Sequence, residues 1–204
     1  LGRRRVHVIG EALSINGGRT ENSLMSAIEL TQSTLMDEVV HLRAKAIDSF
    51  STQAIHGAQR ALADVENPLR LNFFSTAMRI LFEHMMDTLS PVDQVTRSSW
   101  FKPERDNGSP TRWQRIVFAI QGGLSDSFVN QELKVDPLPL RKRLLAAVDE
   151  LSKHVHGREN TLIVEEAAQN ATAGATIAAM AAFLDAVHDC RAAVLSPIED
   201  ALDD

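Results

Sequence analysis

The chain has 204 residues and a formal net charge of −6, with 44% hydrophobic residues and one cysteine, Cys190. This length suits one domain with a sizeable core, and the acidic balance excludes a domain that binds nucleic acid through its overall charge. A lone cysteine excludes an internal disulfide and a cysteine-rich zinc site, and it fits a cytoplasmic location. Aromatic residues make up only 5% of the chain, so aliphatic side chains must fill the core, which favours an all-α fold.

Residues 1–20 are expected to form an N-terminal arm, and residues 21–204 a multi-helix bundle with long helices at both ends. From Glu21 to Val65 apolar residues recur at helical spacing, which predicts one long helix or two collinear helices. The chain starts at Leu1 and ends inside a helical pattern, so we expect a piece of a longer protein. No apolar run approaches the roughly 18 residues that span a bilayer, and no membrane partner is predicted.

Local signals divide the middle of the chain. Asn67-Pro68 predicts a helix from about Pro68 to Leu89, and residues 97–110 form a loop rich in Gly, Pro, Ser and Asn. Thr111 is expected to cap the next helix. The buried stripe of the helix that ends at Leu89 comprises Phe74, Ala77, Met78, Leu81 and Met85.

The second half of the chain is expected to hold three more helices. Gln121-Gly122-Gly123 ends one helix, and Ser125 starts a short one that reaches about Leu133. The helix after Pro139 ends at Gly157, a residue typical of the position just past a helix end. The last helix begins at Thr161 and is rich in alanine, and Ser196-Pro197 is expected to interrupt it.

Two histidines lie near the end of the helix that Gly157 terminates. On a helical wheel His154 and His156 fall on opposite sides of the apolar stripe, roughly 160° apart. They cannot bind one metal ion from a regular helix, where ligands need a spacing of three or four residues, so neither a metal site nor a cofactor is predicted. Two interpretations stay open: a histidine that interacts with the helix C-terminus, or one used in acid–base or phosphate chemistry.

Both tryptophans lie beside basic residues in and after the 97–110 loop. Such a surface is suited to stacking bases and contacting phosphates, and the alternative is that the aromatic side chains anchor the loop while the charges are solvated. The candidate nucleic-acid-binding residues are Trp100, Lys102, Arg105, Arg112, Trp113 and Arg115. Arg70 lies near the apolar face of its helix, so a carboxylate from another helix is expected to pair with it.

A series of short motifs carries a family resemblance over about residues 60–160. The motifs are Asn67-Pro68-Leu69-Arg70-Leu71-Asn72-Phe73-Phe74, Arg79 with His84, Trp100-Phe101, Gln114-Arg115-Ile116, Ala119-Ile120-Gln121-Gly122-Gly123-Leu124-Ser125 and Leu151-Ser152-Lys153-His154-Val155-His156. Together they resemble the helical region of predicted prokaryotic PIWI-associating nucleases, bacterial proteins linked to defence against phages and plasmids. The resemblance implies an N-terminal helical part followed by a separate β-rich nuclease domain.

The helical part is also similar to HEPN domains, α-helical bundles of prokaryotic defence whose RNases use an arginine followed four to six residues later by a histidine. Neither His154 nor His156 has such an arginine, and the pair Arg79 and His84, which has the spacing, diverges by roughly 140° on a straight helix. The leading expectation is therefore interaction, through self-assembly, a partner protein, or RNA or DNA. The alternative is a metal-independent RNase that uses His154, His156 and Arg158, and a third reading is structural scaffolding.

Overall fold

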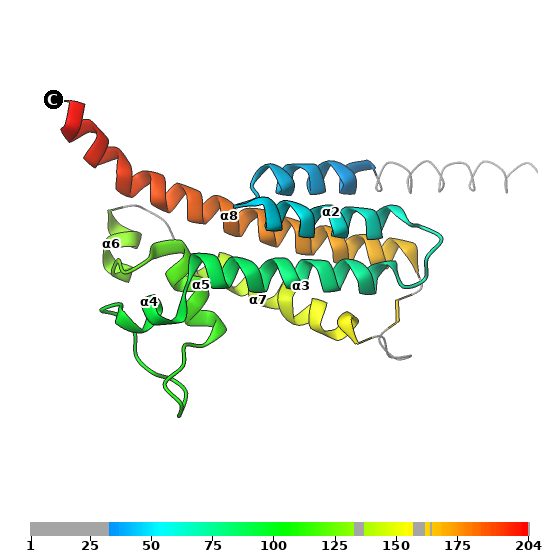
Figure 1. The fold of residues 1–204 in the computed structure, drawn as a ribbon, viewed down its shortest axis with the longest axis horizontal. Coiled ribbons are helices and arrows are strands. Elements are labelled where there is room, and N and C mark those ends of the chain that lie inside the picture. Colours follow the sequence, from blue (N-terminus) through cyan, green and yellow to red (C-terminus); the bar gives the residue numbers. More distant parts are fainter. Residues whose placement is uncertain (1–32, 133–136, 157–161, 164, 204) are drawn as a thin grey trace, which may run out of the picture.

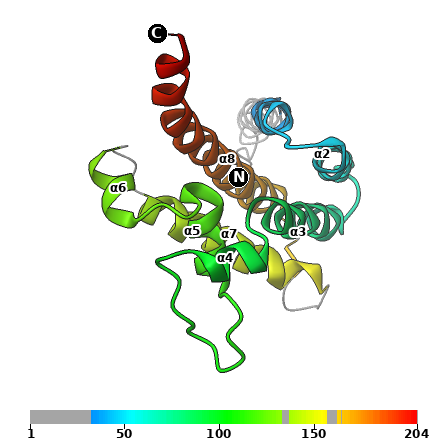
Figure 2. The same ribbon diagram turned by 60° about the vertical axis from the view of Figure 1, so that its left-hand side comes forward.

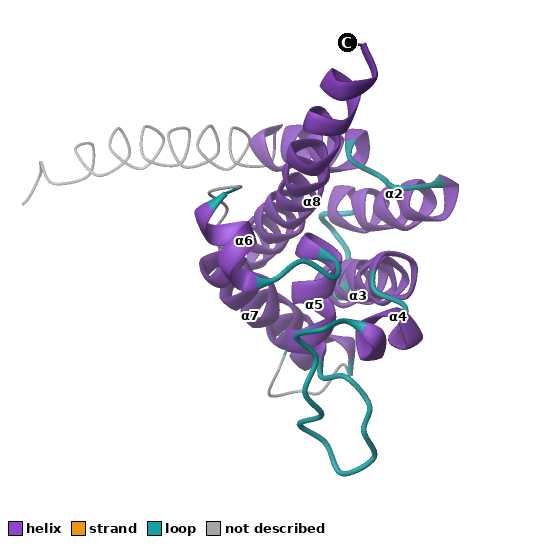
Figure 3. Ribbon diagram, turned by 90° about the vertical axis from the view of Figure 1, so that its left-hand side faces the viewer, coloured by secondary structure: helices purple, strands orange, loops and turns teal. Residues whose placement is uncertain are grey.

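The computed structural model describes residues 33–132, 137–156, 162–163 and 165–203, and the regular elements in this part of the chain are all helices (Figures 1 and 3). This confirms the predicted all-α bundle with a long C-terminal helix. Residues 33–44 form the first described helical segment. The elements that follow are α2 Ser49–Ala63, α3 Arg70–Leu89, α4 Val92–Arg97, α5 Arg112–Gln121, α6 Asp126–Gln131, α7 Pro137–Val155 and α8 Glu166–Asp203.

The chain reverses direction between the segment 33–44 and α2, so the prediction of one long helix or two collinear helices is wrong. Figures 1 and 2 show the two helices side by side. The turn closes with a hydrogen bond from the Lys45 amide to the Leu42 carbonyl, and Asp48 then caps α2 by accepting the Ser51 amide at 2.7 Å. Leu42 and Ile55, on either side of the turn, are both buried in the core, so helical spacing alone could not reveal the reversal.

Helix α3 lies at the centre of the bundle and contacts α2, α5, α7 and α8. Four members of its predicted stripe, Phe74, Met78, Leu81 and Met85, are buried, and Ala77 is half-buried. The helix starts at Arg70, two residues later than expected, because Asn67 forms a turn first. The Asn67 side-chain oxygen accepts the Leu69 amide at 2.9 Å, and its carbonyl accepts the Arg70 amide at 3.0 Å.

The predicted helix signals of the middle region are confirmed. Thr111 and Gln114 form a capping box at the start of α5, and Gly122 takes a positive φ of 61° where α5 ends. Ser125 caps α6 by accepting the Phe128 amide at 3.3 Å. The short helix α4 was not predicted, and it leaves a loop at residues 98–111 that projects from the bundle (Figure 2).

Helix α8 runs without interruption to Asp203, so the predicted break at Ser196-Pro197 is wrong. A proline in a helix removes one backbone donor, and the bonds of the neighbouring turns maintain the helix here. At 38 residues α8 is roughly 57 Å long, against about 30 Å for α3, and its last turns project beyond the other helices (Figure 1).

The first thirty residues of α8 contradict the expectation that no apolar stretch approaches the length that spans a bilayer. The part Glu166–Leu195 is long and apolar enough to cross a membrane by length and composition, with a mean hydropathy of 1.3 over 18 residues. The many alanines of this helix produce that value. Half of the same window is buried inside the bundle, which is the environment of a core helix.

Arg70, at the start of α3, connects three helices through a fully buried guanidinium group. Its Nε donates to Gln169 Oε1 at 2.5 Å, and its terminal nitrogens donate to Asn170 Oδ1 at 3.0 Å and to the Leu62 carbonyl at 3.4 Å. The carboxylate that was expected to pair with Arg70 is that of Glu166 on α8, whose Oε1 lies 3.7 Å from the Arg70 Nη2. Neutral amides are nevertheless the nearest acceptors, and they fix α3 against the start of α8 and the end of α2.

Replacement of Arg70 tests this connection. Arg70→Met keeps much of the side-chain volume but leaves Gln169 and Asn170 without their donor, so we expect the free energy of unfolding to fall by about 3 kcal/mol. Arg79→Met is the matched control on the same helix, because Arg79 pairs only with the exposed Glu83 at 3.2 Å among the described residues, and its loss should stay within about 0.5 kcal/mol. Urea unfolding measures both. Equal, small losses would contradict the structural role of Arg70.

Candidate functional site

The end of α7 holds the histidines that the sequence singles out. His154 is buried, with 4% of its surface exposed, and its Nε2 lies 3.3 Å from Glu150 Oε1. Its backbone carbonyl accepts the Asn72 side-chain amide at 2.5 Å, which joins α7 to α3. His156 is exposed, and Arg158 lies outside the described residues. His154 and His156 therefore occupy different environments, and the structure does not bring them together.

Glu150 is the partner that determines the charge around His154. Lys153 donates a hydrogen bond to Glu150 at 2.6 Å, and this bond is the main reason why the pKa of Glu150 lies below its ordinary value, with a smaller contribution from His154. The carboxylate is therefore ionised at neutral pH. A buried ring with a carboxylate partner at a helix junction is typical of a structural histidine.

The Arg79 and His84 side chains also diverge, as their helical spacing predicts. Arg79 pairs with Glu83, whereas the His84 Nε2 lies 2.6 Å from Asp48 Oδ2 and the His84 ring lies 4.5 Å from the Phe50 ring. His84 thus connects α3 to the cap of α2. In this conformation the pair does not form an arginine–histidine site.

The two tryptophans are half-buried and hold neighbouring elements together. The Trp100 Nε1 donates to the Gly122 carbonyl at 3.1 Å and so fastens the 98–111 loop to the end of α5. The Arg141 guanidinium lies over the Trp113 ring, 4.3 Å from its centroid, and links α7 to α5. These contacts agree with the interpretation that the aromatic residues anchor the loop and the helices.

The basic residues of the candidate nucleic-acid interface have different environments. Arg115 donates to Asp87 at 2.7 Å and to the Ser90 carbonyl at 3.2 Å, and Arg112 lies 3.6 Å from a carboxylate oxygen of Asp149. Lys102 and Arg105 are exposed on the projecting loop. The carboxylates offset the charge of the two α5 arginines, so the six residues do not form one continuous basic surface.

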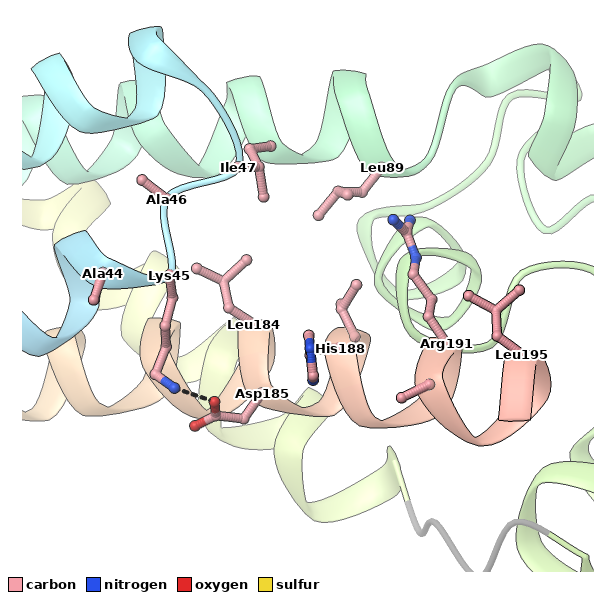
Figure 4. Close-up of a pocket in the computed structure, with 12 residues that line it drawn as sticks. Ala44, Lys45, Ala46, Ile47, Leu89, Leu184, Asp185, His188, Arg191 and Leu195 are labelled. Atoms are coloured by element: carbon pink, nitrogen blue, oxygen red, sulfur yellow. Dashed lines mark hydrogen bonds and ion pairs between the residues drawn. The ribbon is translucent and has the colours of Figure 1, made fainter. Parts of the chain in front are cut away.

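Two adjoining cavities form a concave feature beside the second half of α8. The first, of about 690 Å³, lies between α8, residues 44–47 and the end of α3 (Figure 4). The second, of about 530 Å³, lies between α8, the end of α3 and the end of α5. We call them together the α8 groove; the residues that line both cavities are Leu89, Arg191 and Leu195.

The walls of the α8 groove are mainly apolar, and its charges are few. Lys45 forms an ion pair with Asp185, and the His188 Nδ1 lies 3.5 Å from a carboxylate oxygen of Asp189. Arg191 is exposed and lines both cavities; Figure 4 shows it in the first cavity. No carboxylate of the described residues forms an ion pair with it. Burial raises the pKa of the neighbouring Cys190 thiol, so this side chain acts as an apolar part of the wall.

Sequence reasoning missed the α8 groove because its lining comes from distant segments. Residues 44–47, the end of α3, the end of α5 and α8 are brought together only by the fold. The available signal was the spacing of Leu184, His188, Arg191 and Leu195, which places them on one face of a helix. Two polar residues within an apolar stripe indicate a surface that is only partly covered.

Asp48 gives the bundle a pH-dependent contact. Its pKa is lowered from 3.8 to about 2, first because the Ser51 amide donates a hydrogen bond to it and then because His84 does so. A lowered pKa in the folded state stabilises the fold above the ordinary pKa, and this stabilisation is lost as the pH falls through the lowered value.

Substitution of Asp48 should therefore have an effect that depends on pH. Asp48→Asn keeps an acceptor for the Ser51 amide but removes the charge. We expect a lower melting temperature than that of the parent at pH 6, and the difference should close as the pH falls from about 4 towards 2. Asp48→Ala, which also lacks the cap, should melt below Asp48→Asn at every pH. A difference that stays constant over this range would show that the charge of Asp48 does not stabilise the fold.

Comparison with known proteins places the chain in a family. The sequence model of the predicted pPIWI-associating nucleases matches residues 43–180, which is more than half of the chain, and the chain therefore belongs to this family. No curated protein and no solved structure matches it. The matched region contains the Arg70 connection, the end of α7 and the part of the α8 groove lined by residues 44–47, the end of α3 and the end of α5. It stops within α8, before the α8 residues that line the groove.

Proposed function

We propose that this chain, a domain of a predicted pPIWI-associating nuclease, is the N-terminal, HEPN-like interaction region of a bacterial defence protein that acts in the cytoplasm. Cleavage belongs to a separate nuclease domain, and the α8 groove is the surface that binds a protein partner. The observation that carries the proposal is a contrast: the His154 side chain is buried beside Glu150, whereas the groove is open and mainly apolar.

The composition of the groove resembles the centre of a protein interface. Such centres combine apolar side chains with arginine and are poor in other charges. Here Leu195 is 51% exposed beside Arg191, while Lys45 and Asp185 offset each other's charge. A nucleic-acid surface would need several uncompensated cations to bind phosphates, and the groove does not supply them.

The alternative function is a HEPN-like, metal-independent RNase. The observation that favours it is the position of His156, which is exposed at the end of α7 within the family match. His154 and Arg158 would complete the site, and all three side chains would have to surround one phosphate. The burial of the His154 side chain and its contact with Glu150 make this arrangement costly, because the ring would have to leave both to reach a phosphate.

A cleavage assay separates the two functions. We expect the purified chain to leave single-stranded RNA intact in the presence of EDTA and to cause no mobility shift at physiological salt. Degradation that His154→Ala or His156→Ala abolishes would establish the RNase instead. His56→Ala, at an exposed position of α2, is the control that should change nothing in either case.

A substitution in the groove tests the interaction in the full-length protein. Leu195→Glu places a charge in the groove, so cells that express the defence system should lose protection against phage by at least tenfold, as for a central interface residue worth about 1.4 kcal/mol. Leu138→Glu is the matched control, because Leu138 is 40% exposed on α7 outside the groove. Circular dichroism of the chain confirms that both variants fold. Full protection with Leu195→Glu would contradict the proposal.

A further inference from the structure

The face of α8 that lines the groove continues into the turns that project from the bundle. Leu184, His188, Arg191 and Leu195 follow one another at spacings of four, three and four residues, so they share one helix face. Helix α8 continues to Asp203 and leaves the bundle beyond the groove (Figure 1). In the sequence Glu199 follows Leu195 by four residues and Leu202 by seven, so helical spacing places both close to the same face.

We infer that a second copy of this chain occupies the α8 groove, with the two α8 helices antiparallel and a twofold axis near Leu195. In an antiparallel pair, residues equally far from the axis lie opposite each other. Arg191 of one copy then lies opposite Glu199 of the other, and His188 lies opposite Leu202. The inference rests on the proposed function, because it names the partner of the same groove.

The charges favour this occupant. Arg191 is exposed between two apolar cavities, and its planar guanidinium is suited to bind a carboxylate through two parallel hydrogen bonds. The sequence of the last turns combines three acidic with three apolar residues, Ile198-Glu199-Asp200-Ala201-Leu202-Asp203. The acidic residues are complementary to Arg191, and the apolar residues are complementary to the two cavities.

Symmetry and helicity add to the argument. In an isologous dimer every contact is made twice, so two grooves and two projecting helix ends are covered together. The projecting end is already helical, and a preformed helix loses less conformational entropy on binding than a disordered segment does. A partner other than a second copy would lack the symmetry and would cover only one groove.

A charge exchange tests the pairing of Arg191 with Glu199. Sedimentation of the 204-residue chain at about 10 to 100 μM should give the mass of a dimer. Arg191→Glu and Glu199→Arg should each weaken the dimer at least ~10-fold, because each places like charges opposite one another. The double variant Arg191→Glu/Glu199→Arg should recover the parent dissociation constant to within about threefold.

Arg105→Glu is the matched control, because it makes the same charge change on the exposed 98–111 loop, and it should form the parent dimer. Circular dichroism of every variant checks the fold. A monomer throughout the concentration range, or single variants that dimerise like the parent, or a double variant that stays dissociated, would each overturn the inference.

These results are distinguishable from a failure of the proposed function. If the chain is monomeric but Leu195→Glu still abolishes protection, the groove binds another protein and only the second copy is wrong. If the chain itself cleaves RNA, the proposed function is wrong whatever its mass.

Discussion

The buried guanidinium of Arg70 is the interaction on which the arrangement of the helices depends. A buried charge costs several kcal/mol unless its donors are satisfied, so Gln169 must stay level with Arg70. Helices α3 and α8 start at the same end of the bundle and run in the same direction (Figure 1). Because all α-helices rise equally per residue, the end of α3 at Leu89 comes level with about His188. Helix α8 continues beyond that point, and the α8 groove lies where α8 passes the end of α3 and the end of α5.

The parts of the fold that were predictable are those with local causes. Thr111, Ser125 and Gly122 act through hydrogen bonds or backbone angles within a few residues, so their sequence neighbours reveal them. The reversal at residues 45–48 has no glycine or proline, and the apolar spacing continues across it because both helices bury residues in one core. At Pro197 the local rule was misleading, since one lost hydrogen bond did not end a helix of 38 residues.

The candidate sites show the same division between local and distant causes. Helical geometry correctly separated Arg79 from His84, and the chemistry of a buried arginine correctly required partners for Arg70. The sequence could not show that Glu150 and Asn72 enclose His154, although Glu150 lies only one turn away. Nor could it show that Asp87 and Asp149 neutralise the arginines of α5. The sequence could not show the α8 groove, because the groove depends on where α3 ends beside the second half of α8, more than ninety residues later in the chain.

The central claim is that the second half of α8 is an interface between copies, continuous with a core fixed by Arg70. Hydrogen–deuterium exchange along α8, measured at low and high protein concentration, tests it most directly. Amides near Arg191 and in the projecting turns up to Asp203 should exchange more slowly at high concentration, because the second copy covers them. Those near Ala173 and Ile177, which lie in the core of the bundle, should not change. Exchange in the projecting turns that is fast and independent of concentration would contradict the account.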